Sequence, residues 1–190
     1  LHSGDRVVFV ISGGLYTYSI QSDTLVSFGA KFSTTAQCYF CQVDRFFVVQ
    51  DGDSAAVVLE EDSTTGEPVV NAGATSVPVG TIMLYAHGRV QEVPEYVAGT
   101  TESGKPYFIS GDVIKPNAPS DVLGFTETEY WNEGGAHGLP QELGFITAMG
   151  AMRNAATGTG VGSCIVMARN GMSAFDLSIA RSQWNSTQLA

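Results

Sequence analysis

Apolar and polar positions along the chain repeat one hairpin pattern four times: an apolar, strand-forming run, a tight turn and a second alternating run. The copies cover residues 7–20, 38–49, 81–93 and 164–177, with turns expected at Gly13-Gly14, Asp44-Arg45, His87-Gly88 and Asn170-Gly171. Gly, Asn and Asp supply the positive φ that hairpin turns need. The first three copies begin roughly 30 to 45 residues apart, a spacing typical of propeller blades or another repeated sheet.

This pattern predicts a mainly β fold of repeated antiparallel hairpins, propeller-like, with β-blade repeats over residues 1–124. Because successive side chains of a strand point to opposite faces, Tyr16 and Tyr18 should share one face and Leu15 and Thr17 the other. Continuous apolar runs such as residues 7–11 predict strands that are covered on both sides, as in stacked blades.

Residues 125–162 differ from the repeats, and we expect a loop and helix insertion between blades there. Pro140 fits the first turn of a helix, near residues 140–154. Apolar residues are spaced along one side of this helix, at Leu143, Ile146, Met149 and Met152. Gly144 and Gly150 would each weaken it by roughly 1 kcal/mol relative to Ala.

The last part of the chain, residues 163–190, predicts a further β-hairpin and a polar tail. The chain begins at Leu1 without Met and enters a strand almost at once. We therefore expect it to be a segment of a longer polypeptide.

The chain is weakly charged and acidic. Charged residues make up 15% of its 190 positions, where about 25% is typical, and the net charge is −10. Its nine Lys and Arg residues are scattered singly, whereas phosphate contacts need them clustered, which argues against a nucleic-acid-binding surface. A polar surface with few charges suits extended contact with other proteins. No apolar run reaches the 18 or so residues of a membrane span.

Cys38 and Cys41 form a CxxC pattern inside an expected strand. Residues three apart on a strand point to opposite faces, so these two thiols should share neither a metal ion nor a disulfide. We predict that they are small buried hydrophobic side chains.

One acidic and aromatic segment is the best candidate for a site. It contains Glu127, Glu129, Tyr130, Trp131, Glu133 and His137. Paired carboxylates can divide acid and base roles, aromatic rings can stack on sugars, and His137 could move a proton near neutral pH. Tyr and Trp are also enriched where proteins contact one another, so the segment also fits an interface loop, and we favour this interpretation over catalysis.

Two other motifs are better explained by turns and connectors. The glycines of residues 158–162 have G-x-G-x-G spacing, but they precede a strand, whereas a dinucleotide site needs them between a strand and a helix. Asp51 and Asp53 could begin a calcium loop, but the later bidentate Glu is missing. We therefore expect no metal site, nucleotide site or cofactor.

Two stretches of the chain together resemble the propeller-bearing tail nozzle proteins of short-tailed bacteriophages, also called tail tubular protein B. The first is the pair of opening hairpins, residues 6–28 and 38–59. The second is Gly138-Leu139-Pro140-Gln141-Glu142-Leu143-Gly144-Phe145-Ile146-Thr147, which leads to residues 162–179 and their Ala168-Arg169-Asn170-Gly171 turn. The resemblance covers about two thirds of the chain, at the level of pattern.

The resemblance implies a structural virion protein and no enzyme: a nozzle component made in the host cytoplasm and placed in the virion tail. Such subunits assemble as a homo-oligomer, a hexameric ring, with other virion tail proteins. The ring forms part of the distal channel for genome ejection, through which genomic DNA passes without sequence-specific binding. An acidic wall would let DNA slide past, because like charges repel.

Two other functions remain open at the level of sequence. One is a propeller-type carbohydrate-binding protein or glycoside hydrolase with its site at Glu129, Glu133 and His137. The other is a phage receptor-binding or adhesion module, in which exposed blade loops contact a receptor.

Overall fold

A computed structural model describes residues 6–43, 46–71, 77–94, 107–112, 114, 135–156, 161–177 and 185–189. The chain divides into two compact units, Leu1–Thr81 and Ile82–Ala190. Each unit is built from two antiparallel sheets, and each sheet contains strands that are consecutive in the chain.

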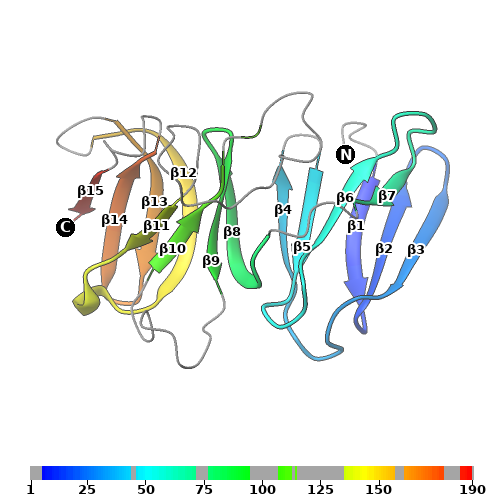
Figure 1. Ribbon diagram of the computed structural model, residues 1–190, viewed down its shortest axis with the longest axis horizontal. Helices are drawn as coiled ribbons and strands as arrows, with labels where there is room; N and C mark the ends of the chain where they lie inside the picture. The colour runs from blue at the N-terminus through cyan, green and yellow to red at the C-terminus, as the bar shows by residue number, and fades with distance from the viewer. Residues whose placement is uncertain are drawn as a thin grey trace. The chain divides into compact units, whose positions relative to one another are not determined.

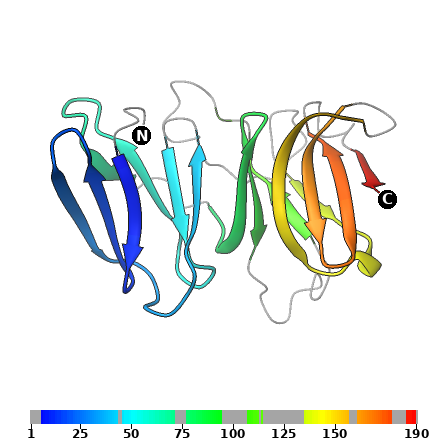
Figure 2. The same ribbon diagram turned by 180° about the vertical axis from the view of Figure 1, so that it is seen from behind.

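The first unit contains sheets 1 and 2 (Figure 1). Sheet 1 has three strands in the order β1 (Arg6–Ile11), β2 (Gly14–Ser19) and β3 (Thr24–Ala30). Sheet 2 has four, in the order β4 (Tyr39–Val43), β5 (Phe46–Gln50), β6 (Val57–Glu61) and β7 (Pro68–Val70). Figure 2 shows the same neighbours from behind, with β1, β2 and β3 side by side.

Sheets 3 and 4 form the second unit. Sheet 3 is ordered β11-β10-β9-β8, with β8 (Gly80–Ala86) beginning at the boundary, followed by β9 (Arg89–Pro94), β10 (Tyr107–Ser110) and β11 (Gly135–Gly138). Sheet 4 has the order β12 (Ile146–Ala156), β13 (Val161–Ala168), β14 (Gly171–Asp176) and β15 (Asn185–Leu189).

The prediction of a mainly β chain of repeated antiparallel hairpins is confirmed, because every sheet pairs its strands in chain order. The turns agree closely with the expected positions. His87-Gly88 turns as predicted, with φ of 54° and 69°. The first turn lies one residue earlier, at Ser12-Gly13, with φ of 48° and 76°, and the last lies at Arg169-Asn170. The turn at residues 44–45 lies outside the described residues.

Each unit has a core between the facing sides of its two sheets. In the first unit the buried core residues are Leu15, Phe32, Val49, Val57 and Leu59. In the second they are Phe108, Leu139, Leu143, Cys164, Val166, Phe175 and Leu177. Phe108 and Phe175 meet edge to face, with ring centroids 4.9 Å apart. Sheet-on-sheet packing of this kind joins consecutive blades of a repeat protein.

Continuous apolar runs behave differently in the two sheets of the first unit. Strand β5 is buried on both faces, since Phe46, Val48 and Val49 are all inaccessible to solvent. Strand β1 is not, because Val8 and Val10 contact the core while Val7 and Ile11 on the other face are exposed. The expectation that residues 7–11 are covered on both sides is therefore wrong.

The predicted helix near residues 140–154 is also wrong. Pro140 is followed by a single 3-10 turn, Gln141–Leu143, and Gly144 ends it at a φ of 75°, a value that few other residues adopt. The chain then continues as strand β12. Register shifts between Ile146 and Ala148 place Ile146 and Met149 on the same face, against the core. A bulged strand therefore reproduces the three-residue spacing of a helix.

The predicted division of the chain at residues 125–162 falls partly outside the described residues and stays a prediction. The described residues of that segment include two strands: β11 pairs with β10, and β12 pairs with β13. The further hairpin of residues 163–190 is present as β13 and β14. The expected polar tail contains strand β15, which pairs with β14. Among the described residues, no helix is long and apolar enough to cross a membrane.

Candidate functional site

Five members of the predicted acidic and aromatic site, Glu127, Glu129, Tyr130, Trp131 and Glu133, lie outside the described residues. His137 is described, in the middle of β11, where it pairs with Phe108. Its ring stacks on Phe108 at 4.8 Å between centroids and meets Phe175 edge-on at 5.7 Å. These contacts hold the half-buried imidazole against the core of the second unit, as a packing residue.

A polar row crosses sheet 3 beside this ring. Ser110 lies opposite Gln91, and its hydroxyl donates a hydrogen bond to the Gln91 Oε1 atom. The Ser110 Oγ atom also lies 3.3 Å from His137 Nε2. Ser110 and Gln91 are both buried, and the one hydroxyl proton is directed at the amide. A catalytic serine must be reachable and must give its proton to a base, so this Ser–His pair is structural.

Arg89 is a second buried polar residue of sheet 3. Its Nη1 atom donates a hydrogen bond of 3.0 Å to the carbonyl oxygen of Gly111. Burial lowers the pKa of the Arg89 guanidinium, and the negative charge of Asp112 opposes that shift. The cation is therefore used inside the unit to tie β9 to the end of β10, and it is unavailable to an external anion.

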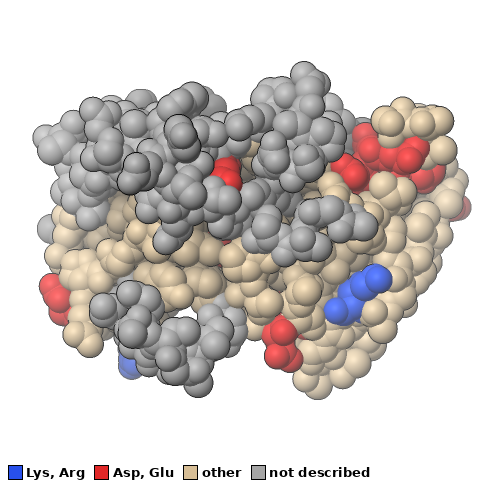
Figure 3. All heavy atoms as spheres, viewed as in Figure 1, with Lys and Arg blue, Asp and Glu red and all other residues tan. Residues whose placement is uncertain are grey.

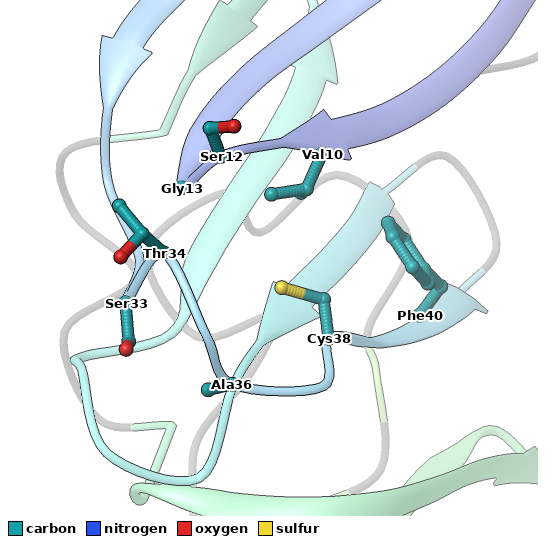
Figure 4. A pocket seen from close by; sticks show the side chains of 8 residues that line it. All are labelled: Val10, Ser12, Gly13, Ser33, Thr34, Ala36, Cys38 and Phe40. Carbon is teal, nitrogen blue, oxygen red and sulfur yellow. The ribbon is translucent and has the colours of Figure 1, made fainter.

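A cavity of about 300 Å³ opens between the two sheets of the first unit (Figure 4). Hydroxyl groups of Ser12, Ser33 and Thr34 line it, together with the Cys38 thiol and the Phe40 ring. Burial, and secondly the charge of Asp51, raises the pKa of Cys38, so the thiol is a poor nucleophile. No charged side chain is among the residues that line the cavity, and its polar side chains are hydroxyl groups and one thiol.

Two short motifs singled out in the sequence of the first unit, the Asp51 and Asp53 pair and the Cys38 and Cys41 pair, have structural roles. Asp51 accepts hydrogen bonds from the backbone of Ser33, Asp53 and Ser54, and it therefore organises a turn. Cys41 pairs with Val48 on one face of sheet 2, while Cys38 contacts the core on the other side, as the sequence predicted. None of the three cysteines forms a disulfide bond. In the described part of the chain, no group of three metal-binding side chains is found.

Sequence reasoning missed the most unusual surface of the first unit, which we call the sheet 1 outer face. It consists of Val7, Phe9, Ile11, Tyr16, Tyr18, Leu25 and Ser27, on the side of sheet 1 away from the core. Val7 is 46% exposed, Ile11 61% and Leu25 59%. The sequence shows that Val7, Phe9 and Ile11 share one side of a strand. It does not show which of the two sides of that strand the core covers.

The second unit has a smaller exposed apolar surface, the methionine row. It consists of Ala148, Met167, Met172 and Leu189, which lie opposite one another across all four strands of sheet 4. Met167 is 42% exposed and Met172 37%. The row lies on the side of the sheet away from the core residues Cys164, Val166 and Phe175.

Charged side chains are sparse on the described surface. On the face in Figure 3, acidic groups are separated by wide uncharged areas, and one acidic group lies over the β6–β7 turn. Arg6 forms an ion pair with Glu67, which lies in the connection between β6 and β7, at 3.2 Å between Nη1 and Oε2. On the described part of this face, the surface is therefore weakly charged, as expected from composition.

Comparisons with protein-family models, with curated proteins and with solved structures each found no match.

Proposed function

We propose that this protein is a structural subunit of a homo-oligomeric assembly, a tail nozzle component of a short-tailed bacteriophage that surrounds the distal DNA-exit channel. The observation that carries the proposal is the sheet 1 outer face. Three strands present aliphatic and aromatic side chains to solvent, with no charged residue at any of the seven positions. Exposed apolar surfaces of this kind mark sites of protein contact.

The repeat architecture supports the same proposal. In proteins built from stacked sheets, an apolar sheet face is normally covered by a neighbouring sheet. The outer face of sheet 1 is apolar and its edge strand β3, with the sequence Thr-Leu-Val-Ser-Phe-Gly-Ala, has no charged residue or proline that would block pairing. Such a sheet is typical of a subunit that is covered in its assembly.

Charge supports the finer part of the proposal. A channel for DNA should not hold the phosphate backbone, and a net charge of −10 with scattered cations gives no attractive surface. The polar side chains of sheet 3 are arranged as internal hydrogen bonds, and Ser110, which lies beside His137, is buried and donates its proton to Gln91. A structural role therefore fits the described residues better than hydrolysis does.

Immuno-electron microscopy tests the nozzle proposal. Antibodies raised against the purified chain are applied to the virus particles of its source, with antibodies against a head protein as the control. The proposal expects label at the distal end of the tail. Label on the head, or particles that contain none of the chain, would contradict it.

A further inference from the structure

Asn170 and Gly171, at the turn between β13 and β14, form the single Asn-Gly pair of the sequence. We propose that this pair is a site of spontaneous deamidation, and that loss of the Asn170 side-chain amide releases the loop of residues 139–145 from the turn. The inference does not depend on the proposed function, because it concerns a covalent change within the second unit.

Three hydrogen bonds connect the β13–β14 turn to this loop, and together we call them the loop–turn contact. The Asn170 Nδ2 atom donates a bond of 3.0 Å to the carbonyl oxygen of Glu142. The backbone nitrogen of Asn170 donates one of 2.9 Å to the carbonyl oxygen of Leu143. The backbone nitrogen of Arg169 donates one of 3.0 Å to that of Phe145. The Asn170 side chain therefore helps to hold the loop on the hairpin.

The structure requires both residues of the pair. The amide of Asn170 supplies a donor to the Glu142 carbonyl oxygen, which an ionised carboxylate does not have. A Cβ atom at Gly171 would lie 2.8 Å from Leu143 Cδ2, so a larger residue would displace that side chain. Leu143 is 2% exposed and belongs to the core of the second unit. The packing that fixes the loop therefore also fixes a chemically labile sequence.

The reaction needs water and no other co-reactant. The backbone nitrogen of Gly171, which no side chain shields, attacks the Cγ atom of Asn170. A bond from this nitrogen to Cγ forms, the bond from Cγ to Nδ2 breaks, and ammonia leaves with the proton of the Gly171 N–H. Water then opens the resulting succinimide ring at either carbonyl carbon, which gives aspartate or isoaspartate and releases a proton. Asn170 is exposed, so water reaches it.

The fold controls when the pair can react. The bond to Glu142 keeps the Asn170 side chain on the loop, and Gly171 pairs with Ala168 in the register of β13 and β14. Both arrangements must give way before the attack, so the reaction proceeds from a locally opened state. The carboxylate that forms only accepts hydrogen bonds, and it would face the carbonyl oxygen of Glu142. Deamidation therefore converts a transient opening into a permanent one.

Peptide mass spectrometry during incubation at mildly alkaline pH tests the site in the full chain. Gly144→Ala weakens the loop–turn contact, because Gly144 has a φ of 75° and an added Cβ would lie 3.4 Å from the Arg169 Cβ atom. Gly66→Ala, in the first unit, is the matched control, with a φ of 69° and nothing within 4 Å of an added Cβ. Deamidation at Asn170 should be several-fold faster in Gly144→Ala than in the wild type and in Gly66→Ala.

Near-ultraviolet circular dichroism checks that the variants fold. If Gly144→Ala does not, the wild type in urea below its unfolding transition replaces it, since urea also favours local opening. An Asn170 that stays intact both in the wild type and in the opened state would overturn the inference, and so would equal rates of deamidation in the two.

Hydrogen exchange of Asn170→Asp tests the consequence for the loop. This variant should lose protection at the backbone amides of positions 169 and 170, seen as faster exchange of peptides that span residues 165–172. Gln141→Glu, the same change of amide to acid at an exposed position of the 3-10 turn, should keep wild-type protection. Wild-type protection in Asn170→Asp would overturn the role given to the side-chain amide. None of these results bears on the proposed function, which rests on the first unit.

Discussion

Asp51 connects two segments of the first unit that are far apart in sequence. Its Oδ2 atom accepts a hydrogen bond of 2.8 Å from the backbone of Ser33, and its Oδ1 atom accepts one of 2.7 Å from the backbone of Ser54. Burial alone would raise the pKa of this carboxyl, but the hydrogen bonds outweigh it and hold the pKa below its ordinary value. The charged form of Asp51 therefore stabilises the fold.

We predict that Asp51→Asn lowers the free energy of unfolding by about 1–3 kcal/mol at pH 7. Because the folded-state pKa is lowered, this stability is present above the unfolded-state pKa, near 3.9, and is lost as the pH falls through the folded-state value. Urea unfolding at pH 7 and at decreasing pH measures the difference, with Asp53→Asn, at an exposed position of the same turn, as the control. A difference that stays constant down to low pH would contradict this account.

The cysteines differ in accessibility. Burial raises the pKa of the Cys164 thiol to about 12, and Cys41 is also buried, whereas Cys38 is half-buried at the cavity of the first unit. Since the thiolate is the reactive form, alkylation of the folded protein should modify Cys38 first and leave Cys164 unmodified until urea unfolds the chain. Peptide mass spectrometry over a time course of iodoacetamide checks the order, and early modification of Cys164 would contradict it.

The hairpin of β1 and β2 is fixed to the rest of the first unit at Gly13. The Gly13 carbonyl oxygen accepts hydrogen bonds from the backbones of Lys31 and Phe32, at 2.9 and 3.1 Å. A Cβ atom at Gly13 would overlap the carbonyl oxygen of Phe32, at a φ of 76°. This turn is therefore both a bend in the chain and a contact with the β3–β4 connection.

Gly13→Ala should therefore destabilise the first unit more than Gly29→Ala does. Gly29 has the same φ of 76°, but nothing lies within 4 Å of an added Cβ, so its substitution isolates the backbone strain, about 1–2 kcal/mol. The additional loss at Gly13, a further 1 kcal/mol or more, measures the clash with Phe32. Chemical denaturation of the two variants gives both values, and equal losses would show that the contact is unimportant.

At the scale of elements, the sequence predicts unbulged strands well and bulged ones poorly. Cys38 directly precedes the regular strand β4 and Cys41 lies in it, three positions further on, and the two lie on opposite sides of sheet 2 as expected. Ile146 and Met149 have the same separation, but a register shift places both against the core. A bulge in β12 depends on how this strand pairs with β13, and the local sequence of residues 140–154 does not reveal that pairing. The spacing of the apolar residues in this segment therefore predicts a helix instead.

At the scale of the whole molecule, the repeated hairpins were sufficient to predict a mainly β chain of antiparallel sheets. They were not sufficient to predict the surface on which the proposed function depends. Val7 and Val8 are the same residue type and adjacent, yet one is exposed and the other contacts the core. Which side of a strand is covered depends on the neighbouring sheet, and that information becomes available only with the fold. The propeller-like arrangement of the sheets stays a prediction.

The measurement that tests the central claim most directly is sedimentation equilibrium of the wild-type chain over a concentration series, since it gives the molar mass independently of shape. The account predicts a defined species with six times the 20.1-kDa mass of the chain, in exchange with monomer at low concentration. A monomer that persists at the highest concentration would contradict the claim that the sheet 1 outer face is a subunit contact.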